Sequence, residues 1–232
     1  MATFGVESMA TYVLIHGAGD VGWYWHLVVA ELRERGQDVV TMDLPVEDDL
    51  AGLTAYADVV VEAMSGRRDA IVVAQSFAGY VAPLVCERVP SQLLVLVAGM
   101  VPRPGESAQE MLANTGYKPE RREDKSDLAT FYHDVPPALA REAIARGRRQ
   151  SETPGRQPWP LAAWPKVPTR FLLCRDDRLF PAAWLRRVVK DRLGLPPDEI
   201  DSGHTPALSR PKELVERLTE FRHALATERR HS

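Results

Sequence analysis

The sequence contains few cysteines. Only Cys86 and Cys174 occur among its 232 residues, and each lies within an apolar stretch. A small disulfide-stabilised protein would carry more cysteines, and a zinc site would show Cys or His in pairs at short spacing. We therefore interpret both residues as buried thiols of a reducing compartment, and the sequence predicts no metal site.

Long apolar runs are also missing. The longest run, residues 93–101, has about nine residues, whereas a membrane-spanning helix needs about 20. The N-terminal stretch lacks the basic and then apolar pattern of a secretory signal. We therefore expect a cytoplasmic protein with no membrane partner.

Positive charge is not in excess. The chain has 29 Lys and Arg against 32 Asp and Glu, which gives a formal net charge of −3. Proteins that bind the phosphates of nucleic acids are usually basic, so we expect no nucleic-acid partner. Hydrophobic residues make up 45% and charged residues 26% of the chain, a balance that excludes a disordered or fibrous protein.

Short apolar runs rich in Val, Ile and Leu alternate with helix-length segments. Runs without polar alternation are typical of strands buried on both faces of a parallel sheet. This alternation predicts an α/β fold with a doubly wound, mostly parallel sheet of six strands. The predicted strands are residues 12–15, 39–42, 70–74, 93–98, 170–174 and 199–201.

One long segment interrupts the alternation. Residues 102–165 hold nine of the 18 prolines and no strand-like run. Insertions of this length are uncommon unless they serve a function. We therefore expect residues 1–101 and 166–232 to form one core domain, with residues 102–165 inserted as a lid over its site. The alternative is a surface insertion without a role in the site.

Residues 17–22 match the GxGxxG pattern of dinucleotide-binding proteins, and Asp43 follows about 20 residues later, at the end of a predicted strand. However, Trp23, Tyr24 and Trp25 would begin the next helix, where the backbone must approach a pyrophosphate closely. No Tyr-x-x-x-Lys pair is present to act as a dehydrogenase acid and base. We therefore expect no cofactor, and we interpret Asp43 as a strand-end carboxylate.

Ser76 lies between the predicted strand 70–74 and a helical pattern. A serine at such a turn is typical of a nucleophile elbow, in which the residues two positions away must be small. Here they are Ala74 and Ala78 rather than the usual glycines. The N-terminus of the following helix would offer N–H groups to developing negative charge. The alternative is a serine that only caps a buried helix.

Asp177 and His204 follow the fifth and sixth predicted strands. An activated serine needs a base that takes its proton and an acid that orients the base. Because parallel strands end at one edge of a sheet, where such folds bind ligands, we predict a catalytic triad of Ser76, His204 and Asp177. The backbone N–H groups of Ala18 and Phe77 would form the oxyanion hole.

The order Ser76, Asp177, His204 resembles that of the α/β-hydrolases, in particular the branch of plant methylesterases, hydroxynitrile lyases and small bacterial esterases. The resemblance implies the strand order 2-1-3-4-5-6 and cofactor-free ester hydrolysis through an acyl-enzyme. It also implies that the acid that orients His204 is Asp177 and not Asp176. Asp177 begins the family's Asp-Arg-x-x-Pro motif. The matching stretches are residues 13–18, 22–25, 74–78, 98–102, 177–181 and 202–206.

The elbow departs from this family, which usually has Gly-His-Ser-Leu-Gly where this chain has Ala-Gln-Ser-Phe-Ala. The resemblance further implies that residues 102–165 form a helical cap whose apolar side chains line the pocket. An alternative is that these side chains only attach the cap to the core. The predicted lining residues are Met111, Leu112, Phe131, Trp159 and Trp164.

These observations favour a serine hydrolase that cleaves a small, largely apolar carboxylic ester. A thioester or a lactone would use the same groups. The lyases of this branch carry a threonine and a lysine where this chain has Gly17 and Thr205, so carbon–carbon cleavage is the less favoured alternative, although Arg175 or Arg178 could supply a charge. A catalytically silent binding protein would not require an intact triad.

Overall fold

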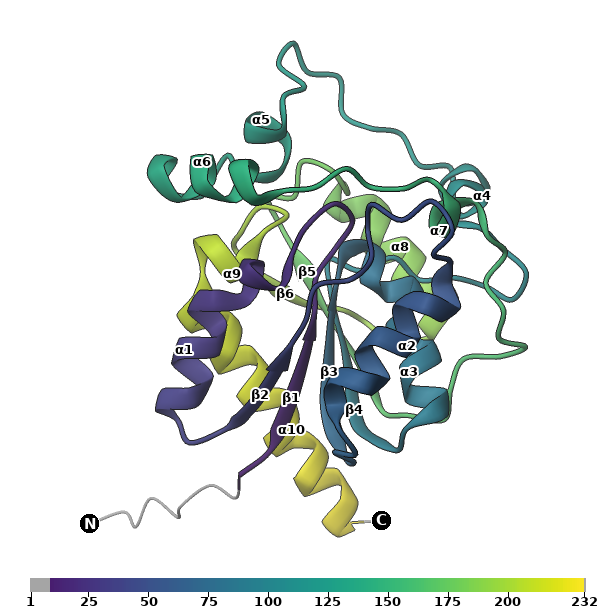
Figure 1. Ribbon diagram of the computed structural model, residues 1–232, viewed down its shortest axis with the longest axis vertical. Helices are drawn as coiled ribbons and strands as arrows, with labels where there is room; N and C mark the ends of the chain where they lie inside the picture. The colour runs from purple at the N-terminus through teal and green to yellow at the C-terminus, as the bar shows by residue number, and fades with distance from the viewer. Residues whose placement is uncertain (1–8, 232) are drawn as a thin grey trace.

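The computed structural model describes residues 9–231, which form a single sheet covered by helices on both faces (Figure 1). All neighbouring strands are parallel, in the order β2-β1-β3-β4-β5-β6. The predicted fold class and strand order are thereby confirmed. The strands are β1 (Thr11–Ile15), β2 (Asp38–Thr41), β3 (Ala70–Gln75), β4 (Ser91–Val97), β5 (Thr169–Cys174) and β6 (Asp198–Ile200).

The helices form two layers (Figure 1). One layer contains η1 (Gly22–Trp25), α1 (His26–Glu34), α9 (Pro206–Ser209) and α10 (Pro211–His231). The other contains α2 (Leu53–Met64), η2 (Ser76–Tyr80), α3 (Ala82–Arg88) and α8 (Ala182–Leu193). Between residues 9 and 231, none of the helices has both the length and the apolar character of a membrane span.

Successive strand residues face opposite layers. In β1, Val13 and Ile15 belong to the core cluster under α2 and α3, whereas Tyr12 and Leu14 belong to the cluster under α1 and α10. Both faces of the sheet are therefore buried, which explains why the strands read as continuous apolar runs. Burying each Val or Leu side chain stabilises the fold by roughly 1.5–3 kcal/mol.

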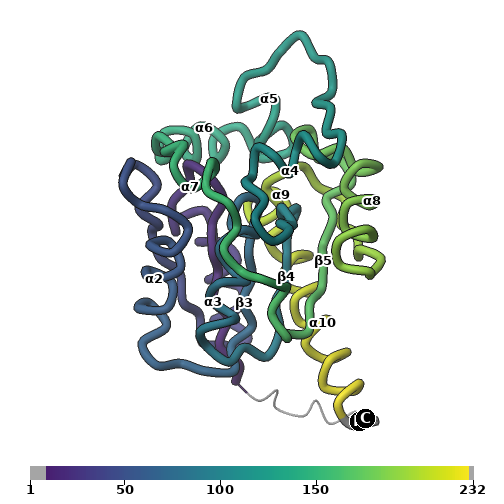
Figure 2. The backbone as a smooth tube through the Cα atoms, turned by 90° about the vertical axis from the view of Figure 1, so that its right-hand side faces the viewer, coloured from purple at the N-terminus to yellow at the C-terminus, as the bar shows by residue number. Residues whose placement is uncertain are grey.

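Residues 102–165, the inserted segment, connect β4 to β5. Its helices lie at the carboxyl ends of the strands, and the chain after them runs down the outside of the domain to the start of β5 (Figure 1, Figure 2). Their helices have only four to ten residues, and extended loops join them. The segment is therefore less regular than the helical cap we expected. Its helices are α4 (Ala108–Asn114), α5 (Asp127–Phe131), α6 (Pro137–Arg146) and α7 (Thr153–Arg156).

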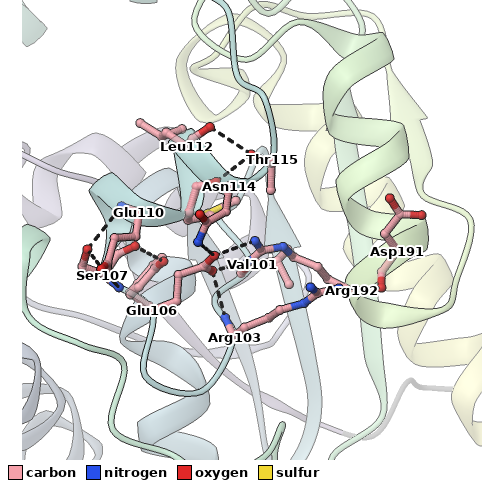
Figure 3. A network of polar contacts seen from close by, with 12 residues as sticks. Val101, Arg103, Glu106, Ser107, Glu110, Leu112, Asn114, Thr115, Asp191 and Arg192 are labelled. Carbon is pink, nitrogen blue, oxygen red and sulfur yellow. Dashed lines mark hydrogen bonds and ion pairs between the residues drawn. The ribbon is translucent and has the colours of Figure 1, made fainter.

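A buried ion pair attaches the start of the inserted segment to α8 (Figure 3). The Arg192 guanidinium donates to both carboxylate oxygens of Glu106, and it also donates to Val101 O at 2.7 Å. Asn114 Nδ2 donates to Glu106 Oε1 at 2.9 Å. Burial opposes the ionisation of Glu106, but these hydrogen bonds outweigh it and hold the pKa of its carboxyl below the usual value.

The two cysteines are free thiols. Cys174 is buried at the end of β5, and Cys86 is partly buried in α3. Burial raises the pKa of Cys86 to about 12 and that of Cys174 well above its usual value. Both thiols are therefore protonated at neutral pH and act as small apolar core residues.

Candidate active site

Ser76 occupies a strained turn between β3 and η2. Its φ of 53° lies in the left-handed region, which costs a non-glycine residue on the order of 1–3 kcal/mol. The turn is held by close packing: Met100 N–H donates to Ser76 O at 3.0 Å, and a Cβ on Gly79 would lie 2.0 Å from Met100 O. This backbone presents the Ser76 side chain at the carboxyl edge of the sheet, as a nucleophile elbow does.

Asp177 and His204 form a buried pair at the same edge. His204 Nδ1 lies 2.8 Å from Asp177 Oδ2, and the two residues are 3% and 4% exposed, respectively. The other carboxylate oxygen of Asp177 accepts from the backbone N–H groups of Leu179 (2.8 Å) and Phe180 (3.0 Å). These bonds fix the carboxylate so that it can orient the imidazole. Asp176, the neighbouring acid, is exposed to solvent.

Ser76 and His204 line one cavity of about 420 Å³. Within the described residues no hydrogen bond joins the two side chains, a separation that is common before substrate binds. Apolar walls are supplied by Phe131, Ile144 and Leu179. The Phe131 and Phe180 rings lie 5.6 Å and 5.4 Å from the His204 ring, which keeps this side of the imidazole dry.

Two backbone N–H groups near Ser76 could receive an oxyanion. Ala18 lines the cavity, and among the described residues its N–H donates to no protein acceptor. Phe77 is the second residue of η2, so its N–H has no acceptor within that helix. Sequence reasoning assigned these same two groups to the oxyanion hole.

His16 holds the loop that carries Ala18, a role that sequence reasoning missed. Its side chain is fully buried. Nδ1 donates to Gly17 O at 2.9 Å, and Nε2 accepts from Leu44 N–H at 3.0 Å. Burial lowers the pKa of His16 to about 4, so the ring is neutral at physiological pH and ties the ends of β1 and β2 together. Its place directly before the glycine motif was the available signal.

Gln75 was also missed, and it links the elbow to the loop that carries His204. Its Nε2 donates to His204 O at 3.1 Å. Its Oε1 occupies the space beside Gly17, where a Cβ would lie only 2.2 Å away. A side chain at position 17 would therefore displace the Gln75 amide from its place beside the elbow.

The inserted segment contacts the loops on both sides of the Asp177–His204 pair. His133 Nε2 donates to Asp176 O at 3.0 Å, and Asp134 Oδ2 accepts from Gly203 N–H at 2.7 Å. The Thr205 hydroxyl donates to Phe131 O at 2.7 Å. The local sequence gives no signal for these contacts, because their partners lie 43 to 74 positions further along the chain.

Of the five side chains predicted to line the pocket, only Phe131 does so. Met111 and Trp159 are buried in the core cluster under the inserted segment, and Leu112 and Trp164 pack against its edge. Trp159 Nε1 donates to Tyr80 O at 3.1 Å, which anchors that ring in the core. These four side chains attach the segment to the sheet domain, as the alternative interpretation had it.

The structure gives the GxGxxG residues a local explanation. Asp43 Oδ1 accepts from Gly22 N–H at 2.7 Å, so this acid stabilises the turn before η1. A Cβ on Gly22 would lie 2.6 Å from Thr41 Oγ1. Gly19 has a φ of 67°, a conformation that favours glycine.

Sequence comparison identifies the family that this fold and site indicate. The chain matches the model of the alpha/beta hydrolase family over residues 12–217 and belongs to that family. It is 24% identical to methyl jasmonate esterase 1 of Vitis vinifera, over 90% of this chain and 95% of that protein. The resemblance predicted from the motifs, to the branch of plant methylesterases, is thereby confirmed.

Solved structures share the fold. Polyneuridine aldehyde esterase superposes with a TM-score of 0.80 at 17% identity, over 92% of this chain and 99% of that one. A pyrethroid hydrolase from Sphingobium faniae JZ-2 gives a TM-score of 0.77 at 19% identity, over 95% of this chain and 100% of that one. At these identities the likeness concerns the fold.

Proposed function

We propose that the protein is a serine hydrolase that cleaves a small carboxylic ester through an acyl-enzyme. The observation that carries this proposal is the buried 2.8 Å contact between Asp177 and His204, in the same cavity as a serine on a strained elbow. The relatives named above are esterases and hydrolases, which supports the same activity. We further propose that residues 102–165 act as the cap of this site.

In the proposed mechanism, Ser76 Oγ attacks the ester carbonyl and His204 takes its proton. Asp177 keeps the imidazole in the tautomer that presents a free nitrogen to the serine. The Ala18 and Phe77 N–H groups stabilise the oxyanion. His204 then returns the proton to the leaving alcohol, and water attacks the acyl-enzyme by the same steps.

The cavity lining narrows the substrate class. A volume of about 420 Å³ suits a small ester. The sequence predicts a largely apolar substrate, but four of the five apolar cap residues expected in the lining lie elsewhere. The observed lining combines the apolar side chains with those of Asp20, Asp127 and Arg148. The cavity can therefore also bind polar groups of a substrate.

Carbon–carbon cleavage is less well supported by the surroundings of the site. Gln75 Oε1 occupies the space beside Gly17, and the Thr205 hydroxyl already donates to Phe131 O. Arg175 is paired with Glu199 and Asp201, and neither Arg175 nor Arg178 lines the cavity of Ser76. Positions 17, 175, 178 and 205 therefore supply no cation to the cavity that could stabilise a cyanide leaving group as a lysine would.

The direct test compares the wild type with Ser76→Ala. The wild type should react with a fluorophosphonate probe and hydrolyse p-nitrophenyl esters of short acyl chains, whereas Ser76→Ala should do neither. Loss of a triad member commonly lowers kcat by about 10³-fold or more. Mandelonitrile and a short acyl thioester serve as comparison substrates. Turnover of Ser76→Ala within about tenfold of the wild type, or serine-dependent cleavage of mandelonitrile without any ester cleavage, would contradict the proposal.

A further inference from the structure

Asp20 is a carboxyl group in the active-site cavity that the proposed mechanism does not use. It lies two residues after Ala18 and lines the cavity together with Ser76 and His204. Its Oδ1 accepts from Val21 N–H at 2.9 Å. Within residues 9–231 no basic side chain forms an ion pair with this half-buried carboxyl.

The groups that face Asp20 come from several elements. Burial raises the pKa of Asp20 to about 6; the Val21 N–H lowers it, the Asp43 carboxylate raises it, and His204 lowers it. Burial raises the pKa values of Tyr24, in η1, and Tyr132, directly after α5, and the negative charge of Asp20 raises both further. Asp20 is therefore ionised at neutral pH and neutral in mild acid.

The other charged groups of the cavity do not cancel this carboxylate. Among the described residues Arg148 is the one Lys or Arg that lines the cavity. Its guanidinium lies 3.6 Å from both the Asp43 and the Glu47 carboxylates. Asp127, an exposed acid at the start of α5, adds a second negative charge to the lining. The cavity is thus negative at neutral pH, with Asp20 as its more buried charge.

We infer that Asp20 selects substrates by charge: its carboxylate favours esters that carry a cationic or hydrogen-bond-donating group and disfavours anionic esters. This inference rests on the proposed function. It follows from the shared cavity, since a charge in a poorly solvated site interacts strongly with a charged ligand. It also names a specificity-determining residue on the loop that carries Ala18, outside the inserted segment.

The test uses ester pairs of equal shape and different charge. For the alcohol side, acetylcholine is compared with 3,3-dimethylbutyl acetate. For the acyl side, the p-nitrophenyl esters of 4-trimethylammoniobutanoate and 5,5-dimethylhexanoate are compared, with the mono-p-nitrophenyl ester of glutarate as the anionic member. The ratio of kcat/KM within a pair cancels any pH dependence of the catalytic steps, because both substrates share those steps.

For at least one pair, the wild-type ratio of kcat/KM for the cationic ester to kcat/KM for the neutral ester should increase as the pH is raised through about 6, because Asp20 ionises there. The anionic ester should lose relative rate over the same range. Asp20→Asn should abolish this pH dependence and lower the ratio at pH 7.5 by roughly tenfold or more. Asp58→Asn, which removes an exposed charge on α2, is the matched control and should leave the ratio unchanged.

Ratios that do not depend on pH in the wild type, or that survive in Asp20→Asn, would overturn the inference. Failure of the proposed function would look different, because the neutral esters would then show no Ser76-dependent cleavage. In that case, NMR titration with choline and 3,3-dimethylbutanol still decides the inference without turnover. Choline should bind more weakly to Asp20→Asn, and the neutral alcohol should not; equal binding of choline to both proteins would refute the role of Asp20.

Discussion

The sheet domain and the inserted segment are stabilised by different kinds of interaction. Strand residues such as Val13 on one face of the sheet and Leu14 on the other are fully buried among apolar neighbours. The inserted segment buries fewer apolar side chains and depends on particular polar contacts, among them Glu106–Arg192 and Asp134 with Gly203 N–H. The comparison shows that apolar burial forms the platform, whereas specific polar pairs place the segment above it.

The largest expected effect concerns chemistry carried by the sheet domain alone. Asp177→Asn should lower kcat by about 10⁴-fold, because the amide no longer holds the imidazole in the required tautomer. Steady-state kinetics with a p-nitrophenyl ester measures the change. Asp176→Asn is the matched control and should stay within about twofold of the wild type, since its side chain is exposed. A similar loss in both variants would mean that the loop rather than the Asp177 carboxylate matters.

The next largest effect should be a loss of stability. It concerns the ion pair at the start of the inserted segment, which does not line the cavity of Ser76. Arg192→Met leaves Glu106 buried without its partner, which should lower the free energy of unfolding by about 3–5 kcal/mol. The double variant Arg192→Met with Glu106→Leu should recover most of that loss. Urea denaturation measures both variants. A single variant as stable as the wild type would show that the ion pair does not hold the segment.

The same ion pair gives a pH dependence of known sign. The pKa of Glu106 is lowered in the folded protein, so its stabilisation is fully present above the ordinary carboxyl pKa of about 4.5. It is lost as the pH falls through the lowered value. The difference in stability between the wild type and the double variant should therefore shrink in acid.

The smallest effect tests whether the inserted segment positions His204, the proposed base. Asp134→Ala removes the acceptor of Gly203 N–H, next to His204, and should lower kcat by roughly tenfold with little change in KM, alongside a stability loss of about 1–3 kcal/mol. Asp134→Asn keeps an acceptor oxygen and should restore most of kcat. Glu123→Ala, at an exposed position of the same segment, is the control. A change in stability without any change in kcat would show that the inserted segment covers the site but does not position His204.

Much of the sheet domain could be predicted from the sequence because its determinants are local. Apolar runs and their spacing located all six strands. Ser76, Asp177 and His204 could be chosen as candidates because each follows the end of a strand within four residues. In a parallel sheet all strands end at one edge, so sequence position alone brings these side chains near one another. The N–H groups of Ala18 and Phe77 could be assigned for the same reason.

The tertiary structure alone decided how the inserted segment lies and what lines the cavity. Met111 and Trp159 are apolar, and apolarity does not distinguish a pocket wall from a core contact; their burial against the sheet domain resolved it. The partners of Asp134 and Glu106 lie 69 and 86 positions away in sequence, and the charge of Asp20 matters because the fold desolvates it beside His204. Such contacts depend on the relative placement of distant segments, which no local spacing encodes. The sequence by itself therefore determined the sheet and the positions of Ser76, Asp177 and His204 near its edge, whereas the tertiary structure decided how the inserted segment covers the site and which charges surround it.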